Sequence, residues 1–483
     1  MFLQRFYDDQ LAQASYLLGC AATGEALVVD PSRDVARYLE AARREGLRVT
    51  HVTETHIHAD FVSGARELAA AAGAQLLLSA EGGPEWQYAY AAEDGATLLR
   101  DGDIVRVGNV RVEVMHTPGH TPEHLCFVVT DTAAADRPMG VFTGDFVFVG
   151  AVGRPDLLER AVRQSGTMEQ GARALFRSLQ RFKAALPEWV QLWPGHGAGS
   201  ACGKSLGSVP TTTLGYEKLF NTGLAETDEE AFVREVLAGQ PEPPMYFAEM
   251  KRMNREGPRV LGALPRPPRL ADAELAAVLR AGTPVVDARP TAEFGRRHLP
   301  GTLSVPLGKS FTTYAGSVLP YDRDFCLVAP EGADAARMEA AARDLAMIGL
   351  DRCTGWFAAG AVEQAIAAEG CAGQVPDVQP DELEALVAAG AEVVDVRNSS
   401  EFVAGHLPGA ANLPLGRLAE RLDELPRDRT LVVHCQGGGR AGVAASLLAS
   451  HGFSDVRHLE GDYGGWSKAG RPVEKGEGEP VPA

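Results

Sequence analysis

The chain has 483 residues, of which 45% are hydrophobic and 23% are charged, and its formal net charge is −18 at pH 7. Domains usually span ~100–200 residues, so this length predicts about three of them. The acidic charge is spread along the chain, which argues against nucleic acid or an anionic membrane surface as a partner.

Cysteine usage and hydropathy bear on the compartment. There is no run of ~18 apolar residues, and the first residues lack the basic start and apolar core of a signal peptide. The seven cysteines are widely scattered and include no C-x-x-C pair, so they fit neither a disulfide framework nor a zinc ribbon. We therefore expect a cytoplasmic protein without a membrane span, in which individual thiols are free to react.

Residues 1–255 are expected to form the first and largest domain. Short β-type runs such as "ALVVD" and "LCFVVT" alternate with helical stretches such as "VARYLEAARREG". Four further stretches, in this order, contain candidate metal ligands: "THIHADF" (55–61), "TPGHT" (117–121), "FTGD" (142–145) and "WPGHG" (193–197). One H-x-H pair is weak evidence for a metal site, whereas four such stretches in order are strong evidence.

These four stretches resemble the metallo-β-lactamase superfamily. The resemblance implies an αββα sandwich with the ligands in loops at the edge of two packed sheets. It assigns to a first metal the histidines of H-x-H and PGH, which are here His56, His58 and His120. The TGD aspartate, Asp145, would lie within reach of that metal.

A second metal would be poorly served by this sequence. The superfamily pattern H-x-H-x-D-H ends in a histidine, and Phe61 occupies that position here. A second cation would be left with Asp60, Asp145 and His196, one neutral donor short. We therefore predict a single metal.

The stretch "GDFVFVGAVGRPD" resembles the persulfide dioxygenases, which carry Gly-Arg-x-Asp shortly after the TGD aspartate. Arg154 and Asp156 stand at those positions and are predicted to bind substrate. The resemblance implies the iron ligands His56, His120 and Asp145, with His58, Asp60 and His196 as outer groups that orient ligands or hold water. Two imidazoles and one carboxylate suit non-haem Fe(II). We predict one Fe(II) per chain, with O₂ as co-substrate.

Cys202 lies six residues after His196, in the glycine-rich loop "GHGAGSACGKS". Such a loop should lie near the mouth of the metal site, and Lys204 could lower the pKa of the thiol. We predict that Cys202 is catalytic and carries or receives a sulfane sulfur. The alternative, a small buried residue in a packed loop, is left open.

The second half of the chain repeats itself. "VVDARPTAEFGRRHLPGTLSVPL" (285–307) recurs as "VVDVRNSSEFVAGHLPGAANLPL" (393–415), 108 positions later. Each copy predicts a buried strand, a helix start, a Pro-Gly turn and further strand and helix segments, which indicates α/β units with parallel sheets. Pro-rich segments precede both copies, so we predict domains at 265–371 and 376–476.

The second copy contains "VVHCQGGGRAGVAASLL", a Cys-x4-Arg run between a strand and a helix. Glycines let successive N–H groups turn inward, and the N-terminal end of the helix adds positive potential, so the loop should stabilise a thiolate or a persulfide. The run resembles the rhodanese active-site loop. Cys435 is then the nucleophile and Arg440 binds an anionic donor or acceptor. The substrate-binding loop consists of Gln436, Gly437, Gly438 and Gly439.

The first copy should be catalytically silent. Alignment of its strand "FCLVA" with the second copy places Pro330 at the position of Cys435, with few glycines and no suitable arginine. Pro330 also removes a backbone N–H donor. We expect this copy to serve as a spacer, a docking surface or a substrate guide.

Taken whole, the chain resembles the fused persulfide dioxygenase–rhodanese proteins of sulfide detoxification. The resemblance implies oxidation of a low-molecular-weight thiol persulfide to sulfite and thiol, and sulfane-sulfur transfer that makes or uses thiosulfate. The expected partners are a small-molecule persulfide, sulfite and thiosulfate, and further copies of the chain in a homo-oligomer. Two alternatives remain open: a zinc thioester hydrolase of the glyoxalase II type joined to a sulfurtransferase, and a sulfur-relay or sensing protein with a vestigial metal site.

Overall fold

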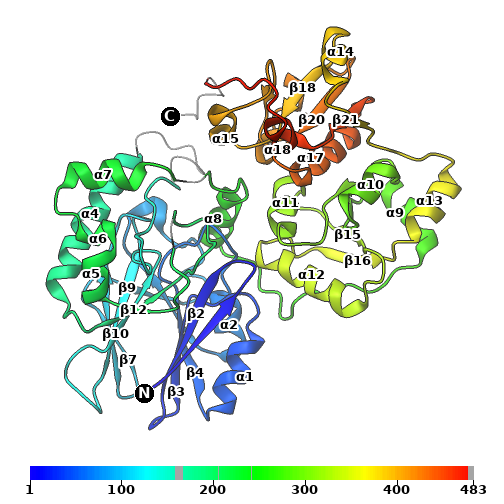
Figure 1. Cartoon of the computed structure of the whole chain (residues 1–483). Coiled ribbons are helices and arrows are strands. Elements are labelled where there is room, and N and C mark those ends of the chain that lie inside the picture. The colour runs from blue at the N-terminus through cyan, green and yellow to red at the C-terminus, as the bar shows by residue number, and fades with distance from the viewer. Residues whose placement is uncertain (158–166, 205, 241, 477–483) are drawn as a thin grey trace. The chain divides into compact units, whose positions relative to one another are not determined.

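The computed structural model describes residues 1–157, 167–204, 206–240 and 242–476. By internal contacts the chain divides into two compact units (Figure 1). The first contains Met1–Pro243 and Phe247–Leu264, and the second contains Pro244–Tyr246 and the chain from Pro265 onward. Both copies of the repeat therefore lie in one unit, and the three-domain division with its boundaries stays a prediction.

The first unit is built on two six-stranded sheets. In spatial order the first sheet consists of β1 (Phe2–Asp8), β2 (Gln13–Cys20), β3 (Glu25–Val29), β4 (Arg48–Thr53), β5 (Gln75–Ser79) and β6 (Thr97–Leu99). The second consists of β12 (Thr212–Thr213), β11 (Gln191–Pro194), β10 (Gly140–Gly144), β9 (Leu125–Asp131), β8 (Val110–His116) and β7 (Ile104–Val107). The first sheet is antiparallel from β1 to β3 and parallel from β3 to β6.

The first unit also contains helices, several of which cover the outer faces of the sheets. They are α1 (Ala36–Arg44), α2 (Ala65–Ala72), the 3-10 helix η1 (Pro84–Trp86), α4 (Thr167–Ala185), α5 (Leu214–Phe220), α6 (Thr222–Ala225), α7 (Glu229–Leu237) and α8 (Phe247–Glu256). In α4 the buried residues Leu175, Phe176, Leu179 and Phe182 recur at helical spacing, which is why one face of this helix packs on the sheet.

Three apolar clusters hold the layers together. One fills the space between the sheets and contains side chains from both, such as Leu18 and Phe127. A second joins the first sheet to α1 and α2, and a third joins the second sheet to α4 and α7. The unit is therefore an αββα sandwich, as the sequence predicted.

The second unit contains two parallel sheets, one for each copy of the repeat. The first copy has the order β14 (Leu303–Ser304), β13 (Val285–Asp287), β15 (Phe325–Val328) and β16 (Cys353–Phe357). The second has β17 (Asp377–Val378), β21 (Val456–Leu459), β20 (Leu431–His434), β18 (Glu392–Asp395) and β19 (Ala411–Asn412). All pairs are parallel, which confirms the predicted α/β class.

Helices connect the strands of both copies. In the first copy they are the 3-10 helix η2 (Asp272–Glu274), α9 (Leu275–Arg280), α10 (Thr291–Arg296), α11 (Phe311–Val318), α12 (Ala335–Met347) and α13 (Ala361–Glu369). In the second they are α14 (Leu383–Ala388), α15 (Ser399–Ala404), α16 (Leu415–Leu418), the 3-10 helix η3 (Leu422–Glu424), α17 (Gly439–Ser450) and α18 (Asp462–Lys468).

Strand register corrects one detail of the repeat. Asp287 of β13 lies opposite Val328, and the matching Asp395 of β18 lies opposite His434. The residue after His434 is Cys435, so its counterpart in the first copy is Ala329 and not Pro330. The first copy still has no thiol at this strand end. Sequence alignment was one residue off because the loops that follow the two strands differ.

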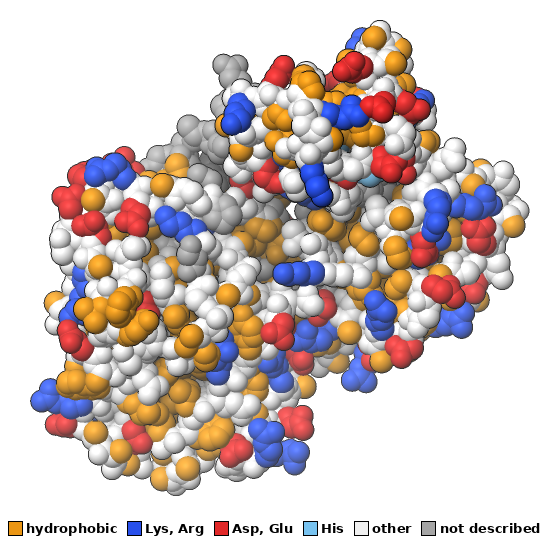
Figure 2. Space-filling model, viewed as in Figure 1, with side chains coloured by type: hydrophobic (Ala, Val, Ile, Leu, Met, Phe, Trp, Pro, Cys, Tyr) orange, Lys and Arg blue, Asp and Glu red, His pale blue; other side chains and the backbone are white. Residues whose placement is uncertain are grey.

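No helix in the described part of the chain is long and apolar enough to cross a membrane. On the face drawn in Figure 2, acidic and basic side chains are interspersed.

Candidate metal centre and cysteine loop

Three predicted ligands converge at the edge of the sandwich in the first unit. His56 follows β4, His120 lies between β8 and β9, and Asp145 directly follows β10. Asp145 Oδ2 lies 3.9 Å from His56 Nε2 and 3.6 Å from His120 Nε2. The three side chains are at most 2% exposed, and one donor atom from each lies within 4.8 Å of the others. Strand ends therefore bring together residues that lie far apart in the sequence.

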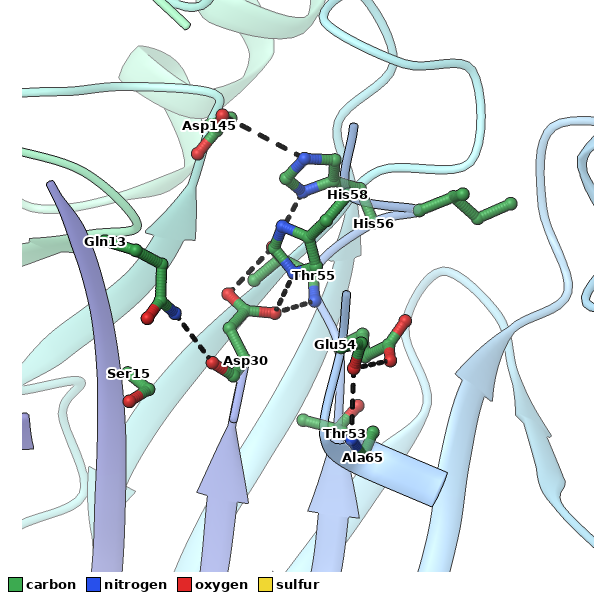
Figure 3. Close-up of polar contacts among 12 residues, drawn as sticks. Gln13, Ser15, Asp30, Thr53, Glu54, Thr55, His56, His58, Ala65 and Asp145 are labelled. Carbon is green, nitrogen blue, oxygen red and sulfur yellow. Dashed lines mark hydrogen bonds and ion pairs between the residues drawn. The ribbon is translucent and has the colours of Figure 1, made fainter. Parts of the chain in front are cut away.

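The ring of His56 is fixed by a chain of hydrogen bonds (Figure 3). Asp30, at the end of β3, accepts hydrogen bonds from Thr55 Oγ1 at 2.9 Å and from the Thr55 N–H at 2.6 Å. Because the Thr55 hydroxyl donates to Asp30, its oxygen accepts from His56 Nδ1, 3.0 Å away. The unprotonated Nε2 of His56 then faces Asp145 as a lone-pair donor.

His120 is fixed in the same way by a backbone group. Its Nδ1–H donates to the carbonyl of Arg154 at 2.9 Å, which leaves Nε2 directed at Asp145. Burial lowers the pKa of both His56 and His120, so both imidazoles are neutral at pH 7, the form in which they bind a metal.

The surroundings of Asp145 fit a cation. Among the described residues, neither carboxylate oxygen has a hydrogen-bond partner, although the side chain is fully buried. A Cβ on Gly153 would lie 1.8 Å from the Asp145 carbonyl oxygen, so only glycine fits there. A buried, unpartnered carboxylate beside two imidazole nitrogens is costly without a positive charge, and a metal ion would supply one.

Arg154 and Asp156, predicted to bind substrate, are fully buried and paired with each other. The guanidinium donates to both Asp156 oxygens, at 2.7 and 2.8 Å, and to the Ala201 carbonyl at 3.0 Å. In this geometry neither side chain faces an open pocket. The pair instead holds the Arg154 carbonyl under His120 and fixes the loop that leads to Cys202.

His58, predicted as an outer group, turns away from Asp145. Its Nε2 lies 3.1 Å from Asp30 Oδ1, and its ring packs on Phe61 with the centroids 4.5 Å apart. Burial by itself would lower the pKa of His58, but the neighbouring Asp30 carboxylate and Asp60 raise it to about 9.

A second group of donors lies beside the first. His196 Nε2 lies 3.2 Å from Asp60 Oδ2 and 3.5 Å from Asp145 Oδ1, and its Nδ1–H donates to the Ala12 carbonyl. Donor atoms of Asp60, His196 and Cys202 lie within 4.8 Å of one another, and all three residues are buried. From the sequence, a second cation would have only Asp60, Asp145 and His196 and would be one neutral donor short. In the structure the Cys202 sulfur lies beside Asp60 and His196 as a further donor. A single metal therefore stays a prediction.

Cys202 does not have the surroundings expected of a free nucleophile. Its side chain is 2% exposed, and burial raises the pKa of the thiol to about 12. Lys204, expected to lower that pKa, donates instead to the backbone carbonyls of Glu235 and Ala238. The expected role of Lys204 is therefore wrong, and a catalytic role for Cys202 stays a prediction.

The cysteine loop of the second unit has the geometry that the sequence predicted. Cys435 directly follows β20, α17 begins at Gly439, and Gly438 adopts a left-handed backbone with φ 92°. The Gly438 N–H donates to Cys435 Sγ at 3.1 Å. Gln436 is exposed, and its carbonyl accepts a hydrogen bond from Gly464 at 3.1 Å.

Asp462 was missed by the sequence analysis. It begins α18 in a left-handed conformation with φ 52°, and its Oδ1 accepts the Cys435 N–H at 2.7 Å. Burial raises the pKa of Cys435, and the Asp462 charge adds to this. The N–H groups of Gly437 and Ala441 and the Arg440 charge oppose it. The predicted cradle exists, but this carboxylate works against a free thiolate.

Arg440, predicted to bind an anion, is already paired. Its guanidinium donates to both oxygens of Glu401, at 2.5 and 2.9 Å. Glu401 lies in α15, within the repeated segment, but nothing in the sequence indicated that it reaches the loop. The same holds for Asp30, whose only signal was that it ends the apolar run "ALVVD", and for the role of Thr55, which is the first residue of "THIHADF".

Family comparisons match each unit separately. The metallo-beta-lactamase superfamily model matches residues 8–196, and the rhodanese-like domain model matches residues 379–469. A crystal structure of a metallo-beta-lactamase from Staphylococcus aureus is 40% identical, covering 74% of this chain and 99% of that one, with a TM-score of 0.64.

Curated relatives of the first unit have two different activities. A hydroxyacylglutathione hydrolase of Polaromonas sp. is 28% identical over 270 residues, which are 50% of this chain and 94% of that protein. A mitochondrial persulfide dioxygenase of Homo sapiens is 29% identical over 200 residues, 41% of this chain and 68% of that protein. Similarity at this level identifies the fold and the kind of site without deciding between the two.

Proposed function

The chain belongs to the metallo-β-lactamase superfamily and carries a rhodanese-like domain near its C-terminal end, and on this basis we propose a bifunctional enzyme of persulfide metabolism. The first unit oxidises a low-molecular-weight thiol persulfide with O₂ to sulfite and thiol, using one Fe(II) at His56, His120 and Asp145. The second unit moves sulfane sulfur through Cys435. Together they remove sulfide-derived sulfur in a reducing compartment such as the cytoplasm.

The observation that carries the first activity is the donor set. Two neutral imidazoles and one unpartnered carboxylate converge in a buried site, a combination that favours non-haem Fe(II) with positions left for substrate. Iron would supply the O₂ chemistry that side chains lack. The similarity to a persulfide dioxygenase supports the same assignment.

The protein's own part is to hold these donors and keep water out. Asp30 through Thr55, and the Arg154 carbonyl, fix the two imidazole rings. Phe61 is fully buried and packs on the ring of His58, whose Nε2 lies beside Asp30. Donors held in place before the reaction need no rearrangement as charge develops on the substrate.

The second activity, sulfur transfer, uses the reacting groups of the Cys435 loop. The Cys435 sulfur attacks the outer sulfur of the persulfide, the bond between the carrier's two sulfurs breaks, and the carrier leaves as a thiolate. The transferred sulfur keeps its oxidation state, so no oxidant is required. Attack of sulfite on the new persulfide then releases thiosulfate and restores Cys435. Backbone N–H groups such as that of Gly438 stabilise the sulfur throughout.

Metal content and O₂ uptake test this proposal together. Anaerobically purified protein loaded with Fe(II) should hold about one iron per chain and consume O₂ when glutathione persulfide is added. His120→Ala should abolish O₂ uptake, whereas Cys435→Ser should leave it unchanged and abolish thiosulfate formation. Equal losses of O₂ uptake in both variants would refute the division of labour.

A second candidate for the first unit is a zinc thioester hydrolase. The specific observation in its favour is Cys202, which with Asp60 and His196 offers three donors to a second cation next to Asp145. The similarity to a hydroxyacylglutathione hydrolase points the same way. Two zinc ions per chain, hydrolysis of S-lactoylglutathione and no persulfide-dependent O₂ uptake would establish this candidate and exclude the dioxygenase.

A further inference from the structure

A pocket of about 750 Å³ lies between the two copies of the repeat, within the second unit. One side comes from α10 of the silent copy, including Ala292 and Arg296, and the other from the loop Gly437–Gly439 and His458. Pockets of ~300–1,000 Å³ enclose small organic ligands. An inorganic anion such as thiosulfate would fill only a small part of this space.

The silent copy packs closely against the helix that follows Cys435. A Cβ on Gly442 of α17 would lie 1.9 Å from Thr291 Cγ2 at the start of α10, so this contact requires glycine. The Ser304 N–H of the silent copy donates to Ser446 Oγ of α17 at 2.9 Å. The pocket wall formed by α10 is therefore held in place relative to the cysteine loop.

The other wall adjoins the loop that holds the reactive sulfur, and Cys435 itself does not line the pocket. Gly437, Gly438 and Gly439 line the pocket, and the Gly438 N–H donates to Cys435 Sγ at 3.1 Å. A ligand in the pocket would contact Gly438, whose N–H binds the sulfur, and the two glycines beside it. The pocket is thus next to the proposed chemistry and not at a remote surface.

Arg296 is the cationic group of this pocket that pairs with no described acidic residue. Its side chain is exposed and makes no ion pair with any described residue, whereas the adjacent Arg297 is paired with Glu363. The other charged lining groups are engaged: His458 contacts Asp377 at 2.8 Å and Asp462 at 3.1 Å, and Glu460 accepts from Gln379. A guanidinium at the rim of an organic pocket recognises a carboxylate.

We propose that this pocket binds the organic part of a persulfide-carrying thiol that bears a carboxylate, and that Arg296 of the silent copy binds that carboxylate. The copy without a thiol then selects the sulfur donor for the copy that has one. This inference rests on the proposed sulfur transfer through Cys435 and names the substrate class for that site. Transfer breaks the sulfur–sulfur bond of the donor, forms the bond to Cys435 Sγ and releases the carrier thiolate from the pocket.

The first test compares two donors in the full-length protein, with sulfite as acceptor for glutathione persulfide and cyanide as acceptor for thiosulfate. Arg296→Glu should lower the ratio of kcat/KM for glutathione persulfide to kcat/KM for thiosulfate by at least ~10-fold, the expected loss of one charge-assisted hydrogen bond. Arg297→Glu is the matched control, because it makes the same charge change one residue away on a side chain outside the pocket, and it should leave the ratio unchanged. An unchanged ratio in Arg296→Glu, or an equal fall in both variants, would overturn the proposal.

The second test measures binding without sulfur transfer. S-methylglutathione, which cannot donate sulfur, should bind the full-length Cys435→Ser protein in calorimetry. Adding Ala292→Trp should abolish binding, because Ala292 is exposed and an indole there would fill the pocket without disturbing the core. Absence of binding, or binding that Ala292→Trp leaves intact, would overturn the pocket assignment. If the wild-type protein bound S-methylglutathione but used neither donor, the proposed sulfur transfer would fail and the pocket would stand.

Discussion

In both copies of the repeat, an aspartate at the end of a central strand pairs with the arginine two residues later. The Asp287–Arg289 and Asp395–Arg397 pairs have N–O distances of 2.7 and 2.6 Å. Each copy also stacks a phenylalanine on a histidine four residues further along, with ring centroids 3.9 and 3.7 Å apart. These shared interactions survive in the copy that has no thiol, so they serve the fold and not the chemistry.

The copies differ where β15 and β20 end. The first copy has Ala329 at the position of Cys435, and its strand leads into a helix that is capped by Asp334. The second copy has the glycine loop, and Asp462 and Glu401 approach that loop from two other helices. Comparison of the copies thus separates side chains that maintain the sheet from side chains that tune the sulfur. Four experiments test this separation, from the largest expected effect to the smallest.

Removal of the thiol should have the largest effect. Cys435→Ser deletes the only nucleophile of the loop and should lower sulfurtransferase activity by roughly a thousandfold or more, measured as thiocyanate formed from thiosulfate and cyanide. Cys371→Ser is the control, because Cys371 is an exposed thiol at the end of the silent copy. Comparable losses in the two variants would remove the distinction between the copies.

The second experiment breaks the shared ion pairs. Asp287→Ala and Asp395→Ala each leave a buried arginine without its partner, since both aspartates are fully buried and both arginines nearly so. Each substitution should lower the free energy of unfolding by about 3–5 kcal/mol, measured by urea denaturation. A much smaller loss in one copy would mean that the pair has a different role there.

The third experiment removes a charge found only in the active copy. The Asp462 charge contributes to the raised pKa of Cys435, so Asp462→Asn should lower that pKa while an amide oxygen still accepts the Cys435 N–H. The rate of Cys435 alkylation by iodoacetamide at pH 7 should rise several-fold, and its pH profile should move to lower pH. A profile that does not move would show that the carboxylate only positions the loop.

The smallest expected effect concerns His458, whose counterpart in the silent copy by strand register is Trp356. Burial alone would lower the pKa of His458, but hydrogen bonds to Asp462 and Asp377 raise it above its ordinary value of 6.5. The contribution of protonated His458 to the free energy of unfolding is therefore complete below pH 6.5, and it is lost as the pH rises through the raised pKa of His458. Urea midpoints should fall over this range in the wild-type protein and less in His458→Gln; parallel curves would contradict this.

Sequence alone predicted the fold class and most of the residues that converge. The prediction used local patterns: the four stretches with candidate metal ligands, the repeat and the Cys-x4-Arg run. Such patterns indicate which strand ends and loops carry reactive side chains. The predicted group of His56, His120 and Asp145 does come together, because in an αββα sandwich these loops share one edge. Metal binding by this group stays a prediction.

Contacts between elements far apart in the sequence could not be predicted. The approach of Asp30 to Thr55 joins two strand ends. The Cys202 loop was expected near the metal site, but the grouping of its sulfur with Asp60 and His196 was not. Asp462 lies 27 residues after Cys435 and occupies a left-handed position that sequence patterns assign to glycine. The alignment of Pro330 with Cys435 was wrong by one residue for a similar reason. The hydrogen-bond register between strands, which sequence alignment does not contain, decides that Ala329 corresponds to Cys435.

The hydrogen bonds that fix His56 and His120 have a consequence for how the protein acquires its metal. Both imidazoles are oriented by groups of the sandwich itself, the Thr55 hydroxyl and the Arg154 carbonyl, and the apolar layer beneath them is built from side chains of the two sheets. Folding and metal uptake are therefore separable, unlike in small zinc domains, where the ion drives folding. A chelator should lower the unfolding midpoint, because the buried Asp145 carboxylate then loses its cation, while the protein stays folded at ordinary temperature, so the bound metal can be exchanged on a folded scaffold.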